Sequence, residues 1–156
     1  YGQTADAYDI VAPAPDGQGA IHSMQFALND AGMKPSEVQY INTHGTSTGL
    51  GDTAESHAVA EVFGDRKTNP DLFVTSTKSM HGHMLGATGA AEAIACIKAI
   101  NDNIVPPTIN LDNQDEEVAD LNYVPYKAVK AEVHAALSNS FGFGGQNASL
   151  IFREVK

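Results

Sequence analysis

Segments with apolar residues at helical spacing alternate along the chain with short apolar runs that are typical of β-strands. From Gly19 to Ala31, Ile21, Met24 and Leu28 recur at intervals of three or four residues, so this segment predicts an amphipathic helix. The next residue is a glycine, which is the preferred residue just beyond a helix C-terminus.

Strand and helix patterns then succeed one another to the end of the chain. The predicted strands cover residues 38–42, 72–75, 133–137 and 148–152, and two further predicted helices cover residues 52–63 and 87–101. Helices placed between strands favour an α/β fold with a mostly parallel sheet, covered by helices on both faces and closed by a hairpin.

The two later helices carry more specific signals. Asp52, followed three residues later by Glu55, resembles a capping box and predicts that the second helix begins there. The third helix, at residues 87–101, is rich in alanine and apolar on nearly every side, so we expect it to be central and buried. Its cysteine, Cys96, is expected to be a small core residue and not a nucleophile.

Composition narrows the class of protein. The chain has 156 residues, of which 42% are hydrophobic and 18% charged, which fits one globular domain. A net charge of −10 argues against nucleic acid or an anionic membrane as partner, and no apolar run approaches a membrane span. A single cysteine fits a reducing cytoplasm. The opening residues lack a methionine and read as the middle of a longer enzyme.

Two histidines, each set in a turn rich in small residues, are the candidate chemistry. His44 follows the first predicted strand and His83 follows the second. Two neutral imidazoles at neighbouring strand ends could converge and polarise one carbonyl group. His81 and His83 could also suggest a metal, but zinc sites use three or four ligands, so we expect neither a metal nor another cofactor.

Glu92 is the only acidic residue in the apolar stretch from residue 87 to residue 100. No cation lies three or four positions away, and an unpaired buried carboxylate is costly. The partner is therefore expected to come from elsewhere in the fold, and Lys78 is the candidate. The alternative is that Glu92 is simply exposed.

Two further turns have both a structural and a functional interpretation. The glycine-rich turn Phe141–Gly145 could offer backbone N–H groups to an oxyanion, although a hairpin also needs glycine. Thr46 and Thr48 could bind a polar linker that enters the site, or could only satisfy their own turn.

Five motifs, taken in order, resemble the C-terminal half of the elongating, type II beta-ketoacyl acyl-carrier-protein synthases, from about Gly19 to Phe152. The motifs are Asn-Thr-His-Gly-Thr-Ser-Thr at residues 42–48, Gly-Asp-x-x-Glu at 51–55, Ser-Thr-Lys-Ser-Met-x-Gly-His at 76–83, Val-Pro-Pro-Thr-Ile-Asn at 105–110 and Asn-Ser-Phe-Gly-Phe-Gly-Gly at 139–145. The resemblance implies that residues 1–156 form a C-terminal thiolase-like domain, whose sheet has five strands.

The resemblance also implies a reaction. The family carries out the decarboxylative condensation of malonyl carrier protein with an acyl thioester in fatty acid elongation, as a homodimer. Its nucleophilic cysteine lies in an N-terminal half that this chain lacks. The implied partners are acyl carrier protein with its phosphopantetheine arm, malonyl and acyl thioesters, and the missing half.

Roles follow for individual residues where they match the family pattern. His44 and His83 match the two catalytic histidines, and Lys78 matches the lysine that supports the second one. Glu92 and Glu55 match acids linked to that lysine. Four more matches are Asp52 in the second motif, Phe143 as the aromatic gate of the acyl pocket, whose N–H forms half of an oxyanion hole, and Thr46 and Thr48 as contacts of the pantetheine arm.

Two positions depart from the family pattern, and two other readings compete. Gly49 stands where many members have proline, and His81 where many have threonine. A non-catalytic partner that sets chain length in polyketide synthases would share the fold, but it need not keep His44, His83 and Lys78 together. A degradative thiolase would need a second reactive cysteine in this half, and the glycine-rich turn has none.

Overall fold

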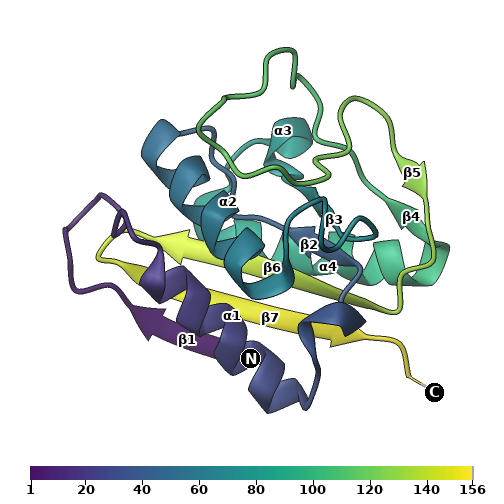
Figure 1. Ribbon diagram of the computed structural model, residues 1–156, viewed down its shortest axis with the longest axis horizontal. Helices are drawn as coiled ribbons and strands as arrows, with labels where there is room; N and C mark the ends of the chain where they lie inside the picture. The colour runs from purple at the N-terminus through teal and green to yellow at the C-terminus, as the bar shows by residue number, and fades with distance from the viewer. Residues whose placement is uncertain (156) are drawn as a thin grey trace.

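A five-stranded sheet crosses the middle of the molecule in the computed structural model, which describes residues 1–155 (Figure 1). The strands lie in the order β1-β7-β6-β2-β3, with bounds Gly2–Ala5 for β1, Gln146–Arg153 for β7, Ala135–Gly142 for β6, Tyr40–Asn42 for β2 and Phe73–Thr75 for β3. Four strands run in one direction and β7 alone runs against them, so the sheet is mostly parallel, as predicted.

Strand β1 was not predicted from the sequence. Its four residues, Gly-Gln-Thr-Ala, have little intrinsic preference for a strand, and only their antiparallel pairing with β7 makes them one. Gly2 is needed because helix α1 (Gln18–Ala31) packs so closely that a Cβ would lie 1.9 Å from the Ser23 carbonyl oxygen. The fifth strand is thus an edge strand defined by tertiary contacts.

Helices cover both faces of the sheet, as predicted. Helix α1 and helix α2 (Gly49–Phe63) share one hydrophobic core with Ile41 and Leu137, whereas helix α4 (Thr88–Asp102) shares another with Tyr40 and Ala136. The neighbouring strand residues Tyr40 and Ile41 fall in different cores because successive side chains of a strand point to opposite faces. The predicted glycine stop of α1 is confirmed, since Gly32 adopts φ 64°.

The structure corrects two predictions about helices. Helix α4 is not buried on all sides within this chain, because Ile94 is 62% exposed and Ile97 is 42% exposed. Helix α2 begins at Gly49 with Thr48 as its N-cap, so Asp52 lies one turn inside the helix and no capping box forms with Glu55. The apolar pattern of α4 recorded composition, whereas burial depends on which elements pack against each side.

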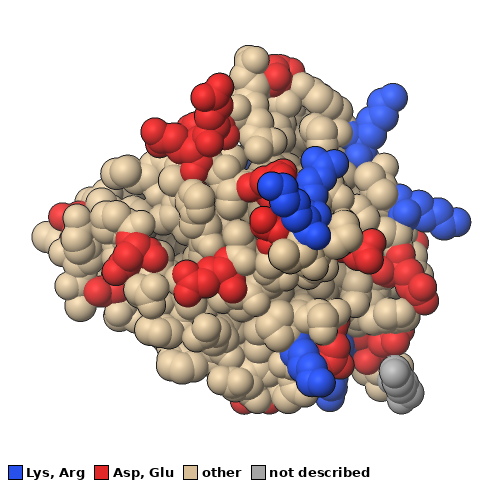
Figure 2. Space-filling view, in the orientation of Figure 1, with Lys and Arg blue, Asp and Glu red and all other residues tan. Residues whose placement is uncertain are grey.

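The carboxyl ends of the parallel strands β2, β3 and β6 meet at one edge of the sheet and carry the histidine turns. Short elements complete this region: η1 (Pro35–Glu37), α3 (Lys78–His81), η2 (Leu85–Ala87), β4 (Ile104–Val105) and β5 (Val129–Lys130). Carboxylates are scattered over the face shown in Figure 2, with lysine and arginine at only a few places. Among residues 1–155, no helix combines the length and apolar character needed to cross a bilayer.

Candidate active site

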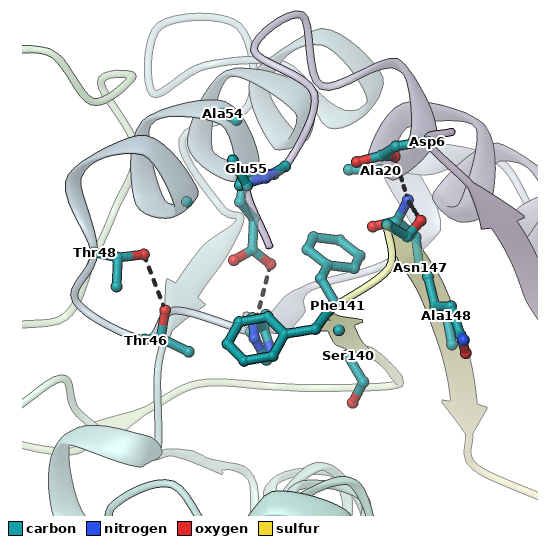
Figure 3. A pocket seen from close by; sticks show the side chains of 18 of the residues that line it. Asp6, Ala20, Thr46, Thr48, Ala54, Glu55, Ser140, Phe141, Asn147 and Ala148 are labelled. Carbon is teal, nitrogen blue, oxygen red and sulfur yellow. Dashed lines mark hydrogen bonds between the residues drawn. The ribbon is translucent and has the colours of Figure 1, made fainter. Parts of the chain in front are cut away.

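The two candidate histidines converge, as the sequence predicted. His44 follows β2 and His83 follows the short helix after β3, and their ring centroids lie 5.6 Å apart with the rings at 84°. Both line a cavity of about 840 Å³, whose wall also contains Phe141 and Phe143. Phe141 at the end of β6 lies with its ring centroid 5.9 Å from that of His44 (Figure 3). The site is therefore built at the ends of three neighbouring strands.

A buried carboxylate holds the His44 turn in place. Glu55 accepts hydrogen bonds from the backbone N–H groups of His44 and Gly45, each at 2.9 Å, and from the Asn139 side-chain amide at 3.0 Å. Burial raises the pKa of Glu55 to about 7, although these donors act to lower it. Glu55 makes no hydrogen bond to Lys78 in the described part of the chain, so the expected link between them is replaced by support of His44.

The His44 ring is kept neutral. Burial is the main cause that lowers its pKa to about 3, and the nearby charges of Lys78 and His83 lower it further. Its Nδ1 atom is buried and has no hydrogen-bond partner within residues 1–155. A neutral imidazole carries one N–H and one lone pair, so at pH 7 His44 can donate one hydrogen bond.

The His83 ring has a defined tautomer. Its Nδ1 atom lies 3.1 Å from the backbone nitrogen of Leu85 and 3.1 Å from the Thr88 hydroxyl oxygen. A backbone N–H can only donate, so Nδ1 must accept, and in the neutral ring the proton resides on Nε2. Nε2–H is thereby left free to donate to a group in the cavity.

Lys78 and Glu92 form the buried pair that the sequence predicted. The Lys78 ammonium lies 2.5 Å from Glu92 Oε1, and the two side chains are 4% and 0% exposed. Burial raises the pKa of Glu92, and Lys78 counteracts this. The alternative that Glu92 is exposed is therefore wrong. Within residues 1–155 no hydrogen bond joins Lys78 to His83, which is held instead by Leu85 and Thr88.

Thr46 and Thr48 lie between two cavities. Their hydroxyl oxygens are 3.2 Å apart, and both residues line the cavity of the histidines and a second cavity of about 550 Å³ (Figure 3). Asp52 and Lys78 line only the second cavity. Burial raises the pKa of Asp52, while backbone N–H groups of the turn at residues 46–48 act to lower it.

The glycine-rich turn places Phe143 at the rim of the first cavity. Phe143 is 77% exposed, so it is not a core residue of the hairpin. Gly144 follows with φ 83°, a conformation that suits glycine, and its N–H donates to the Ile10 carbonyl at 2.7 Å. The turn is thus tied to the loop after β1 by its backbone.

Cys96 is a core residue, as predicted. Its side chain is fully buried in the core on the α4 side of the sheet. Burial raises its pKa to about 12, and the charge of Glu92 adds to this effect. A thiol in this environment is not a nucleophile at neutral pH.

Several supporting residues were missed by the sequence analysis. Asn139 holds Glu55, Leu85 and Thr88 hold His83, and Asn147 donates to Asp6 at 2.6 Å near the glycine-rich turn (Figure 3). Each acts across long sequence separations or through a backbone group, and neither leaves a periodic signal. The one available signal was Thr88, a small polar residue at the start of an alanine-rich helix five positions after His83.

Comparison with known proteins places these residues in a family context. A family model described as "Beta-ketoacyl synthase, C-terminal domain" matches residues 1–112. A protein of Synechocystis sp. named 3-oxoacyl-(acyl-carrier-protein) synthase 2 is 51% identical over the whole chain, and its namesake from Staphylococcus aureus is 50% identical. The chain spans 37% of the length of each of these two relatives.

Solved structures agree with the sequence relatives. A beta-ketoacyl synthase from Burkholderia phymatum superposes with a TM-score of 0.91 at 40% identity, over 99% of this chain and 36% of that chain. A structure titled "The ishigamide ketosynthase/chain length factor" gives a TM-score of 0.92 at 38% identity, over 99% of this chain and 37% of that chain. The expected thiolase-like fold is confirmed by these ketosynthase neighbours.

Proposed function

The chain belongs to the beta-ketoacyl synthase family, whose C-terminal domain it carries, and we propose that it supplies the decarboxylating site of a 3-oxoacyl acyl-carrier-protein synthase. The observation that carries the proposal is the pair of neutral imidazoles that converge on one cavity. In this role they bind the carbonyl oxygen of a malonyl thioester.

The chemistry follows from the donors that the site offers. When malonyl thioester loses carbon dioxide, the bond between its carboxylate and the adjacent carbon breaks. The electron pair then forms an enolate with its negative charge on the thioester oxygen. His83 donates to that oxygen through Nε2–H and His44 donates through its single N–H. Neutral donors suit this step because they need no proton transfer to accept the developing charge.

The enolate carbon then attacks the carbonyl carbon of an acyl group held as a thioester on the nucleophilic cysteine of the other half. The new carbon–carbon bond forms as the carbon–sulfur bond breaks, and the cysteine leaves as a thiolate. The backbone N–H of Phe143 is placed at the cavity rim and can serve the oxyanion of this second step. The acyl chain occupies the apolar side of the cavity beside Phe141 and Phe143.

The malonyl group arrives on the phosphopantetheine arm of acyl carrier protein. Thr46 and Thr48 border both cavities, so an arm that enters through the second cavity passes their hydroxyl groups before it reaches the histidines. Hydroxyl groups can donate to the arm's amide carbonyls or accept from its amide N–H groups. We expect the complete protein to act as a homodimer.

A chain-length-determining partner without catalytic activity is the competing function, and one solved neighbour has that name in its title. Such a partner has no need of a defined His83 tautomer or a neutral His44. An exposed cysteine at a helix N-terminus in the preceding half of the protein would decide for the enzyme.

The test uses the complete protein with malonyl carrier protein labelled at the carboxyl carbon. Removal of one donor to an oxyanion costs about 10²–10³ in rate, so His83→Ala should reduce release of labelled carbon dioxide by that factor. Self-acylation should persist in this variant. His22→Ala, an exposed histidine on α1 outside both cavities, is the matched control. Wild-type decarboxylation in His83→Ala would refute the role.

A further inference from the structure

We infer that His81 is a positioning residue that fixes the peptide from which His83 projects into the cavity. The inference rests on the proposed function of His83. His81 itself does not line the cavity of the histidines, so it acts through its neighbour. It is also a position at which this chain departs from the threonine that is common in the family.

The segment that carries His83 has little packing of its own within this chain. Every residue from Met80 to Ala87 is exposed. Gly82 adopts φ 73° and ψ −175°, a region that is nearly exclusive to glycine, and a Cβ placed on it would meet no atom within 4 Å. Glycine has a large conformational freedom, so side-chain hydrogen bonds have to supply the order that packing does not.

His81 supplies that order at Gly82. Its Nδ1 atom lies 2.8 Å from the Gly82 carbonyl oxygen, which can only accept, so Nδ1 carries a proton and donates. The N–H of Gly82 donates in turn to the Lys78 carbonyl at 2.8 Å. Because a peptide unit is planar, fixing the Gly82 carbonyl also fixes the N–H of His83 in the same plane.

The other ring nitrogen anchors His81 to the buried framework. Nε2 lies 3.1 Å from the hydroxyl oxygen of Thr77, which is 2% exposed and accepts from the Asn42 amide at 2.9 Å. Asn42 is the last residue of strand β2. The chain of contacts therefore runs from the sheet through Thr77 and His81 to the peptide before His83.

This anchor holds in both protonation states of His81. In the neutral ring Nε2 accepts from the Thr77 hydroxyl, and in the charged ring Nε2–H donates to the same oxygen. In the second case the Thr77 proton can turn to Asn42 Oδ1, which lies 3.3 Å away. Glu92 on α4 senses the His81 charge, and Lys78 and His83 are the other titratable groups nearby in this segment. A pH profile therefore does not test the anchor, whereas replacing single nitrogens does.

Three variants of the complete protein separate the two nitrogens of His81. An asparagine amide nitrogen occupies the place of Nδ1 and can donate to Gly82, a glutamine amide reaches the place of Nε2, and alanine offers neither. Small misplacements of a catalytic group cost up to about 10²-fold in rate, so we expect His81→Ala and His81→Gln to slow malonyl decarboxylation about tenfold. His81→Asn should stay within about twofold of the parent. Self-acylation and the KM for malonyl carrier protein should not change in any variant.

A second readout does not depend on activity. With histidine labelled with nitrogen-15, the parent should show His83 with a bare Nδ1 and a protonated Nε2, whereas His81→Ala should show exchange between the two tautomers. Parental decarboxylation in His81→Ala, together with an unchanged His83 spectrum, would overturn the inference. Equal losses in decarboxylation, self-acylation and Tm would also overturn it, since they indicate a general structural role. A parent that fails to decarboxylate refutes the proposed function, and the His83 spectrum then decides the role of His81.

Discussion

Breaking the Lys78–Glu92 pair should destabilise the protein far more than replacing both members. The two charged atoms lie 2.5 Å apart and the side chains are 4% and 0% exposed. Removing one partner leaves the other charge buried without compensation, which costs about 3–5 kcal/mol. We therefore expect Lys78→Met and Glu92→Met each to lower the free energy of unfolding by that amount.

The double variant should recover most of this loss. Replacement of a whole buried ion pair by apolar residues of similar volume is often neutral or stabilising. If the double variant loses at most about 2 kcal/mol, the sum of the singles exceeds it by at least ~4 kcal/mol, which is the expected coupling energy. A gap of this size is well above the ~0.3–0.5 kcal/mol within which independent sites add.

The chain contains a matched surface pair for comparison. Lys98 and Asp102 lie 2.7 Å apart at i and i+4 on the same helix as Glu92, but their side chains are 62% and 44% exposed. Exposed pairs of this kind are worth about 0.3–0.5 kcal/mol, so Lys98→Met and Asp102→Asn should show a coupling no larger than that.

Both cycles can be measured by urea unfolding in the same buffer, with m-values compared to confirm that the unfolding transition is unchanged. Additivity at the Lys78–Glu92 pair within ~0.5 kcal/mol, or a coupling as small as that of the surface pair, would refute the reasoning. Such a result would mean that the carboxylate is neutral or is stabilised by other groups.

Three further predictions concern the site. Glu55→Gln turns one acceptor oxygen into an amide that faces a backbone N–H, and should cost about 1–3 kcal/mol in urea unfolding at pH 8; unchanged stability would contradict this. The folded pKa of His44 is about 3, below its usual 6.5, so its contribution to stability is complete above pH 6.5 and declines as the pH falls toward 3; a nitrogen-15 titration midpoint near 6.5 would contradict this. Gly144→Val should slow acylation of the complete protein more than it lowers Tm, because Gly144 has φ 83°, whereas Gly142→Ala, whose Cβ would approach nothing closer than 4.0 Å, should do neither; a Phe143 ring unmoved between free and acylated crystals would rule out the gate.

Local patterns in the sequence predicted most of the elements. Helix α1 and its glycine stop, the paired strands at the hairpin and the two histidine turns all rest on signals within a few residues. The pairing of Glu92 with a distant cation was also within reach, because an isolated buried carboxylate is too costly to leave unpaired. The family resemblance supplied roles for these residues that spacing alone did not.

The tertiary structure decided what depends on contacts between distant segments. Strand β1 exists only because β7 offers it an edge, and Glu55 serves the His44 turn because helix α2 begins at Gly49. The exposed side of α4 follows from which elements lie beside it, which its apolar composition could not reveal. The low pKa of His44 likewise reflects burial and neighbouring charge. Sequence patterns encode local geometry, whereas burial, pairing and electrostatics are properties of the surroundings that folding assembles.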